Sequence, residues 1–434
     1  MATNFGTADG ILQVNYIGPM RTAINNSCKI LNHMKKKGVT WNGSEGIIAV
    51  HVAHADNIGF SAGGVIPTVT TDETVKQFRL SACKLYGAQD IEGELLVATE
   101  GGDAKAFVSA ISLKTKGLTA QMGIRLNKYT YSGGRCVGFL NELKTGAGGP
   151  GYSDWQFSGD TAKVQEVLTA RGTDVTCQFI RLDTYAVLAT AAVSAVNQSA
   201  STIHVAGALD TSSLPAGTAV GVRVSDADAS LVYLDGECVG IYGNAIEPTL
   251  FGLDRTDATG YKTLQFINRT ATRTGTQARS AFAIPQFQAE LDDIMVASGT
   301  APDRVFVHTN FRSTYSTLFE AKMNVYLAQG KEAVGYEGGI PVDSKGEQRY
   351  SVCGLDIEQD RHCGRGLAIF MSDDTWVFWQ RMPGDLDRTT GSYFKQLYSG
   401  ANLLDKFGFF WKQYLNVICV EGFKNGLVVG LPIV

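Results

Sequence analysis

The feature that most restricts the fold of this chain is a long excursion between two strand-like runs near its N-terminus. IIAVHV at residues 47–52 is followed by ADNIGFSAGGVIPTVTT, which is rich in Gly and Thr, and a strand pattern returns in VKQFRLSACKLYG. The pattern predicts a two-stranded ribbon with a glycine-rich tip over residues 39–86. Such a ribbon is marginal alone in water. We therefore expect it to lie on another surface, as it would in a lattice of subunits.

A basic segment precedes this ribbon. Residues 19–37 predict a helix in which Pro19 suits the first turn and which Gly38 ends. No acidic residue occurs between Gly10 and Ser44, whereas five Lys or Arg residues do. We expect a cationic N-terminal arm that could meet DNA or an acidic scaffold, although a solvated helix face would explain the same charges.

A longer helix is predicted after the ribbon. Residues 103–130 carry apolar side chains at helical spacing, and at 1.5 Å per residue this helix would span roughly 40 Å. Gly117 and Gly123 within it should each cost about 1 kcal/mol relative to alanine, which permits a bend.

The second half of the chain mixes strands and helices. Short Val-, Ala- and Thr-rich runs separated by turn residues fill residues 179–261, and we interpret them as a β-rich insertion because helical periodicity resumes at residues 286–297. Strands are predicted at RVFVHT, LDIEQD, LAIFMS and TWVFW, and a helix at NFRSTYSTLF. A closing hairpin is predicted to turn at Asn425-Gly426.

Composition favours a chain that covers much of its surface with partners. Its 434 residues allow two or three structural units. Only 18% of the residues are charged, against about 25% in an average soluble domain, and exposed apolar surface is a liability. A large homo-oligomer fits these numbers. The formal net charge of −4 argues against a nucleic-acid-binding protein as a whole.

Cysteine usage and hydropathy bear on location. Eight cysteines occur singly, without a CxxC pair, which is typical of reduced cytosolic thiols. The sequence has no apolar stretch of about 18 residues and no basic region followed by an apolar run at its start. We therefore expect a soluble cytosolic protein without a signal peptide.

Several strings match one known family in type and order. NIGFSAGGVIPT is followed by FRL, KLYG and an IEG-type strand, LFGLDRT follows the β-rich segment, and ELDDIMVASGTAPDRVFVH joins a helix to a strand. The chain ends with WKQYLNVICVEGFKNGLVV and a few further residues. In this order the strings resemble the major capsid proteins of tailed bacteriophages of the Hong Kong 97 type, over nearly the whole chain.

This resemblance implies an α+β fold of the Hong Kong 97 type with five parts. They would be an N-terminal arm (1–44), an extended hairpin loop (45–86), a peripheral domain with a spine helix (87–178, completed by about 262–300 and 400–434), a β-rich insertion domain (179–261) and an axial domain (301–399).

The implied function is that of a shell subunit. Hexamers and pentamers would close an icosahedral shell around double-stranded phage DNA. The chain would assemble in the bacterial host cytoplasm and remain in the virion capsid, with scaffolding, portal or decoration proteins as partners and without contact with a membrane. The resemblance implies no enzyme activity, no catalytic residues, no cofactor and no metal.

One departure from the family concerns covalent crosslinking. Some members join subunits through a lysine on the extended loop, yet no Lys or Arg lies between Gly38 and Val75. We therefore predict no isopeptide crosslink from this loop. Covalent oligomers joined within residues 45–75 on a denaturing gel would contradict this prediction.

The clearest enzyme-like motif is GFSAG at residues 59–63, with Ser61 as nominal nucleophile. A nucleophile elbow needs a helix directly after the serine, whereas GGVIPTVTT resists helix formation. A hydrolase that uses Ser61 or Cys353 with His308 or His362 is therefore a distant alternative.

Three sets of residues could suggest a metal. The first set is His51, His54 and Asp56. The two histidines are three residues apart on a predicted strand and so point to opposite faces. Cys353, His362 and Cys363 provide only three ligands, where structural zinc needs four. The third set has EF-hand spacing but has Leu231 at the position that requires glycine; it consists of Asp226, Asp228, Ser230 and Glu237. We interpret all three as ordinary polar or buried positions.

Two further alternatives remain. An encapsulin, a bacterial nanocompartment subunit with the same fold, is usually shorter and lacks such an insertion. A β-rich binding module centred on residues 179–261, for example a tail or adhesin protein, would leave the long helix unexplained. TGAGGPG lacks the Lys-Ser/Thr of a P-loop and is interpreted as a loop.

Overall fold

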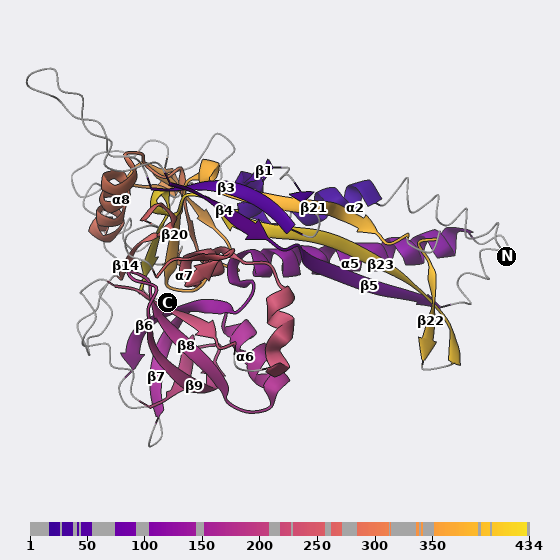
Figure 1. Cartoon of the computed structure of the whole chain (residues 1–434). Coiled ribbons are helices and arrows are strands. Elements are labelled where there is room, and N and C mark those ends of the chain that lie inside the picture. Colours follow the sequence, from indigo (N-terminus) through magenta and orange to yellow (C-terminus); the bar gives the residue numbers. More distant parts are fainter. Residues whose placement is uncertain are drawn as a thin grey trace, which may run out of the picture.

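The computed structural model contains a long sheet with its helix, a hairpin stem, a closed barrel and a mixed sheet (Figure 1). The structure describes residues 17–26, 28–37, 41–42, 45–53, 74–92, 104–144, 152–207, 218–226, 229–256, 262–270, 284–311, 313, 336–337, 340–341, 351–388, 392–399 and 402–431.

The strand β23 (Asn402–Cys419) organises the long sheet. Three antiparallel strands pair along it, and β1 pairs in parallel with β21. These strands are β1 (Lys35–Lys37), β5 (Cys83–Glu92), β21 (Trp376–Leu386) and β22 (Lys395–Ser399). Phe409, Trp411 and Leu415 of β23 are buried, whereas the residues that alternate with them are partly exposed, as in a sheet with one covered face.

Helix α5 (Ala104–Ser132) covers that face, which confirms the predicted long helix. Leu118, Met122 and Leu126 lie in the same buried cluster as Trp411. The close approach of helix and sheet requires a glycine at position 87 of β5. A Cβ atom on Gly87 would lie 2.6 Å from Met122 Sδ and 2.8 Å from Leu118 Cδ1.

The N-terminal segment forms two short helices, α2 (Gly18–Asn26) and α3 (Lys29–His33), followed by β1. The prediction of one continuous helix over 19–37 was wrong. The backbone is extended at Cys28 and at Met34, and the following lysines pair with β21 instead of continuing the helix.

The hairpin stem confirms the predicted two-stranded excursion at its base. Strands β3 (Glu45–Ala53) and β4 (Thr74–Leu80) pair antiparallel, and β2 (Trp41–Asn42) extends this small sheet. Val50 and Phe78 share a buried cluster with Trp379 of the long sheet, so the stem rests on another part of the chain. The predicted glycine-rich tip lies outside the described residues.

A closed barrel of six antiparallel strands follows α5. Its strands are β6 (Cys136–Lys144), β7 (Tyr152–Gly159), β8 (Val175–Arg181), β9 (Val187–Asn197), β10 (Thr202–Ala206) and β11 (Val220–Val224). Val164, Val167 and Leu168 of helix α6 (Thr161–Arg171) join its apolar core.

The bounds predicted for the β-rich insertion, 179–261, were therefore wrong. Strands β6 and β7 precede residue 179 and close the barrel by pairing with β11 and β10. Most of the segment after β11 is not barrel strand. It contains η2 (Ala229–Gly236), α7 (Ile241–Ile246), β12 (Thr249–Leu250) and β13 (Leu253–Asp254), and η3 (Lys262–Leu264) follows.

The mixed sheet has six strands in the order β14-β24-β20-β15-β19-β18. Their bounds are β14 (Ile267–Thr270), β15 (Arg304–Val307), β18 (Ser351–Val352), β19 (Leu355–Gln359), β20 (Leu367–Met371) and β24 (Gly426–Val429). Helix α8 (Ile284–Ser298) buries Phe287, Leu291 and Ile294 against this sheet and ends at Gly299. The smaller elements are β16 (Tyr336–Glu337), β17 (Ile340–Pro341), η4 (Asp373–Thr375) and η5 (Gly422–Lys424).

The mixed sheet corrects two predictions. The prediction of a closing hairpin at Asn425-Gly426 was wrong, because β24 pairs with β14 and β20 and not with β23. The predicted axial segment 301–399 is also divided, since β15, β19 and β20 belong to the mixed sheet whereas β21 and β22 belong to the long one. The predicted strands themselves are confirmed at β15, β19, β20 and β21. The helix predicted at NFRSTYSTLF lies mostly outside the described residues.

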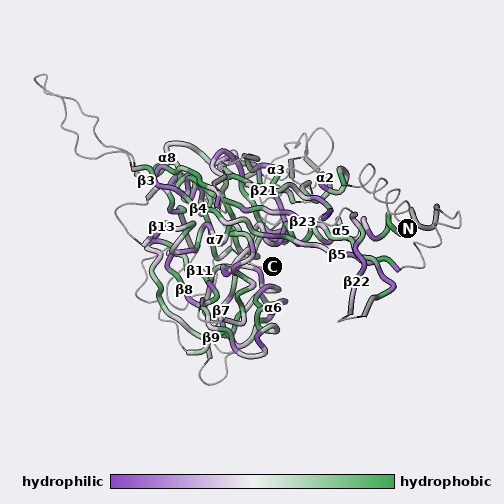
Figure 2. The backbone as a smooth tube through the Cα atoms, turned by 45° about the vertical axis from the view of Figure 1, so that its right-hand side comes forward, coloured by the Kyte–Doolittle hydropathy of each residue, from purple (hydrophilic) through white to green (hydrophobic). Residues whose placement is uncertain are grey.

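Both views show the long sheet and α5 extending away from the barrel and the mixed sheet (Figures 1 and 2). Across the described part of the chain, no helix combines the length and the apolar character needed to cross a membrane.

Candidate assembly surfaces

Lys163 joins the barrel to the end of α5. Its side chain is only 3% exposed, and its ammonium donates to the Gly134 carbonyl at 2.5 Å and to Glu237 Oε2 at 2.6 Å. It also donates to the carbonyl of Ser132, the last residue of α5, where a positive charge is favoured by the helix dipole. Burial raises the pKa of Glu237, against the opposing effect of Lys163.

The start of α6 meets the same helix end. The Asp160 carboxylate caps α6 by accepting the backbone N–H of Lys163 at 2.9 Å, and it accepts the hydroxyl of Ser132 at 2.8 Å. Asp160 therefore satisfies a backbone N–H at the start of α6, and Lys163 satisfies the carbonyl of the last residue of α5. This arrangement fixes the barrel relative to α5.

A second polar junction connects the N-terminal segment, α5 and the mixed sheet. The Cys28 thiol donates to Asn127 Oδ1 at 3.0 Å, and Asn127 Nδ2 donates to both oxygens of Asp360 at 3.2 Å. Nearby, Arg304 contacts Glu358 and Asp373, and His33 lies 3.0 Å from Glu358. The arm is thus held by specific contacts as well as by its apolar side chains.

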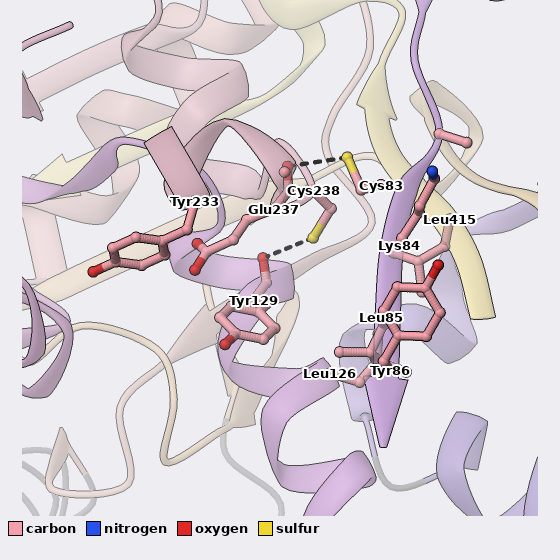
Figure 3. A pocket seen from close by; sticks show the side chains of 12 residues that line it. Cys83, Lys84, Leu85, Tyr86, Leu126, Tyr129, Tyr233, Glu237, Cys238 and Leu415 are labelled. Carbon is pink, nitrogen blue, oxygen red and sulfur yellow. Dashed lines mark hydrogen bonds between the residues drawn. The ribbon is translucent and has the colours of Figure 1, made fainter. Parts of the chain in front are cut away.

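A pocket of about 590 Å³ lies between β5, α5 and η2 (Figure 3). Tyr129, Glu237 and Cys238 lie on one side of it, and Tyr86 on β5 lies opposite. The Cys83 thiol donates to the Glu237 carbonyl at 3.0 Å. Burial raises the pKa of Cys83 to about 12, so this thiol stays protonated and is a poor nucleophile.

Large apolar side chains are exposed on several separate elements. The exposed fraction is highest for Val296 on α8, at 88%, and for Leu113 on α5, at 74%. The others are Val75, Tyr86, Ile124, Val187, Val232, Tyr233, Met295 and Tyr398. A single exposed apolar side chain is ordinary on a protein surface, whereas neighbouring ones, such as Met295 and Val296 on α8, form a candidate contact surface. The sequence patterns did not identify these residues, because a helical stripe does not reveal which apolar residues lie outside the buried face.

The EF-hand-like set does not form a cation site among the described residues. Asp226 lies 2.8 Å from Arg223 and 3.1 Å from Arg135, and Glu237 is taken by Lys163. Arginine and lysine already neutralise these carboxylates. Asp228 lies outside the described residues.

The two cysteine candidates, Cys353 and Cys363, lie in different apolar clusters. Cys363 is buried in the main core, whereas Cys353 packs against the cluster beneath α8. Burial raises the pKa of both thiols and lowers the pKa of His308 and His362. Within the described ranges, no three His, Cys, Asp or Glu side chains are placed to share a metal ion.

The remaining candidate residues lie partly within and partly outside the described residues. His51 lies on β3 and is exposed, while its possible partners His54 and Asp56, the Ser61 motif and the TGAGGPG segment up to Gly151 lie outside the described residues. The basic arm is described at Arg21, which lies 3.9 Å from Asp385, and at Lys29, which donates to the Gln359 carbonyl. The arm therefore makes contacts within the chain.

The fold is that of a phage capsid chain. Over 93% of this chain and 92% of the other, it matches the structure of the cyanophage A-1(L) capsid asymmetric unit, with a TM-score of 0.51 and 10% sequence identity.

Two further solved structures are similar at lower scores. One is from Mycobacterium phage Adephagia (TM-score 0.39, 10% identity, 94% and 90% covered), and the other is a satellite-phage procapsid (TM-score 0.41, 6% identity, 95% and 98% covered). No protein-family model matches the sequence, and no curated protein matches it.

Proposed function

We propose that this chain is the major capsid protein of a tailed phage, with a fold of the Hong Kong 97 type. Its copies would assemble as hexamers and pentamers into an icosahedral shell around double-stranded DNA. The observation that carries the proposal is the fold similarity to the cyanophage A-1(L) capsid structure over nearly the full length of both chains.

The exposed apolar side chains support a shell-building role. They lie on α5, α8, η2, β4, β5, β9 and β22, which are spread over the molecule, so one twofold contact could not cover them all. A subunit with several modest interfaces gains stability from the number of contacts that a closed shell makes at once. This explains how a chain with so few charges would stay soluble once assembled.

Within this proposal, each part has an expected role. The segment up to residue 44 is the N-terminal arm, residues 45–86 include the extended loop, and the long sheet with α5 is the peripheral domain with its spine helix. The mixed sheet with α8 is the axial domain, and the barrel is the insertion domain. Scaffolding, portal or decoration proteins are expected partners, with assembly in the host cytoplasm and the virion as final location.

The proposed role is structural and not enzymatic. Among the described candidates, burial raises the pKa of Cys353 and Cys363, and Asp226 and Glu237 are ion-paired, which supports this role.

The experiment that tests the proposal is electron microscopy with light scattering on the protein expressed alone. Hollow shells tens of nanometres across, or discrete hexamers and pentamers, are the expected result. A monodisperse monomer at every protein and salt concentration would contradict it.

A further inference from the structure

Helix α5 carries an uncovered apolar face on the side that does not touch the long sheet. Leu113, Gly117, Ala120 and Ile124 are all exposed and recur at intervals of four, three and four residues, so they lie on one side of the helix. We call these four residues the α5 face. Beside its C-terminal half is a pocket of about 310 Å³, lined in part by Ala120, Gly123 and Ile124.

Most charged side chains around the α5 face are positive, and Asp360 is the one acidic residue among those that line the pocket. Helix α5 contains Lys and Arg but no Asp or Glu. Lys116 is exposed next to the face, and Lys29 and Arg361 line the pocket. Within the part of the chain that the structure describes, none of these three cations forms an ion pair.

Helix α8 shows the opposite pattern. Its buried side packs on the mixed sheet, while Asp292, Asp293, Met295 and Val296 are exposed. We call these four residues the α8 face. Met295 is 45% exposed and Val296 is 88% exposed, and α8 contains acidic residues but no Lys or Arg.

The two faces are complementary in hydropathy and in charge, yet they cannot meet within one copy. Helix α8 lies at one end of the molecule, whereas α5 runs along the long sheet towards the other end (Figures 1 and 2). Two α5 faces would bring like charges together, and so would two α8 faces. A head-to-tail contact between different copies pairs opposite charges and produces rings or larger assemblies.

We propose that the α8 face of one copy docks on the α5 face of a neighbouring copy. The exposed apolar side chains of the two helices would cover each other, and the aspartates would lie near the lysines and the arginine at the pocket. This inference rests on the proposed shell function and specifies one of its subunit contacts.

Disulfide trapping tests the contact directly. The variant carries Leu113→Cys and Val296→Cys in a Cys353→Ser background, because the other seven native cysteines are buried. We expect mild oxidation to give a ladder of covalent oligomers on a non-reducing gel, lost on reduction. Leu113→Cys with Val187→Cys, a residue 47% exposed on the barrel, is the matched control and should give no ladder.

Charge reversal tests the same contact without a covalent bond. Asp292→Lys with Asp293→Lys should lower the yield of shells by about tenfold, and Lys116→Glu with Arg361→Glu should do the same. The combination of all four changes should restore assembly. Asp174→Lys, on an exposed barrel residue, is the control and should leave assembly unchanged.

The outcomes separate this contact from the shell proposal. If the wild type forms shells but the cysteine variant gives no ladder and the charge reversals change nothing, the proposed contact is wrong and the shell function stands. A ladder without either shells or discrete hexamers and pentamers would support the contact and count against the shell function. A protein that stays monomeric under all conditions would contradict both the contact and the shell function.

Discussion

The ammonium of Lys163 lies 2.6 Å from the carboxylate of Glu237, at the place where the long helix α5 ends and the barrel begins. Both side chains are largely buried, and the same ammonium satisfies carbonyls at the end of α5. A buried ion pair adds little stability compared with an apolar pair, but the loss of one partner is costly because the other charge stays buried. The junction between helix and barrel therefore depends on both residues.

The first prediction concerns the loss of Lys163. Lys163→Met should lower the free energy of unfolding by about 3–5 kcal/mol, because it leaves the Glu237 carboxylate without its cation. Lys116→Met, which removes an exposed lysine from α5, should change it by less than about 0.5 kcal/mol. Urea denaturation of the dispersed subunits, monitored by circular dichroism, measures both. Equal effects of the two substitutions would contradict the importance of the junction.

The second prediction concerns pH. Burial raises the folded-state pKa of Glu237 above its ordinary value of 4.5, so the folded protein binds this proton more tightly than the unfolded chain does. Its contribution to stability is therefore greatest below about pH 4.5 and decreases as pH rises through the folded pKa. Glu237→Gln cannot titrate. The melting temperature of the wild type minus that of the variant should fall between pH 4.5 and neutral pH, and a difference that rises would refute the assignment.

The third prediction concerns Arg255, whose side chain is fully buried and has no carboxylate partner among the described residues. Its guanidinium donates to the carbonyls of Asn244 at 2.6 Å and Glu247 at 2.8 Å, and it lies 4.1 Å from the centre of the Tyr185 ring. Arg255→Lys keeps the charge but loses the planar fork, so we expect a loss of about 3 kcal/mol. In thermal melts, Arg125→Lys on the exposed side of α5 should behave like the wild type.

The fourth prediction compares two glycines at α5. A Cβ atom at Gly117 would meet nothing within 4 Å, whereas one at Gly133 would lie 1.9 Å from the Cys238 carbonyl oxygen. Gly117→Ala should stabilise the dispersed subunit by about 1 kcal/mol, since alanine favours a helix interior. Gly133→Ala should destabilise it by about 1–3 kcal/mol through steric conflict. Opposite shifts in the urea midpoint are expected, and shifts of the same sign would count against this packing.

The fifth prediction concerns thiol reactivity. Cys353 is partly exposed, whereas the other seven cysteines are buried. An alkylating reagent should modify the folded protein at Cys353 first, and Cys353→Ser should remove this fast phase. Because burial raises the pKa of Cys353, the rate should be below that of a free cysteine at neutral pH and should increase with pH. Fast labelling of Cys83 or Cys363, detected by mass spectrometry, would contradict the packing.

The sequence was informative where structure depends on neighbours along the chain. Helical periodicity located α5 and α8, and strand-like runs located the hairpin stem and the strands β15, β19 and β20 of the mixed sheet. Barrel closure was different, because β6 and β7 are separated from their partners β11 and β10 by helix α6, and no local pattern encodes that pairing. The predicted hairpin at the end of the chain was wrong for the same reason, because the partners of β24 are distant in sequence.

The candidate surfaces were even less accessible from sequence. The string GDTAKV carries the Asp160 cap as a recognisable helix start, but nothing in it identifies Glu237 as the partner of Lys163. Leu113 and Leu118 belong to the same helix and have the same chemistry, yet one is exposed and the other buried. Only their position around the folded helix separates a residue available to a partner from one in the core.

The length of β23 has a mechanical consequence. Ten consecutive residues of this strand, from Lys406 to Leu415, pair in register with β5. A force that pulls the two strands past each other must break these pairings together, whereas a force that peels them apart breaks them one after another. The long sheet therefore resists a pull along its strands better than a pull that peels them apart, a difference that would matter in the proposed shell if internal pressure stretched its wall along these strands.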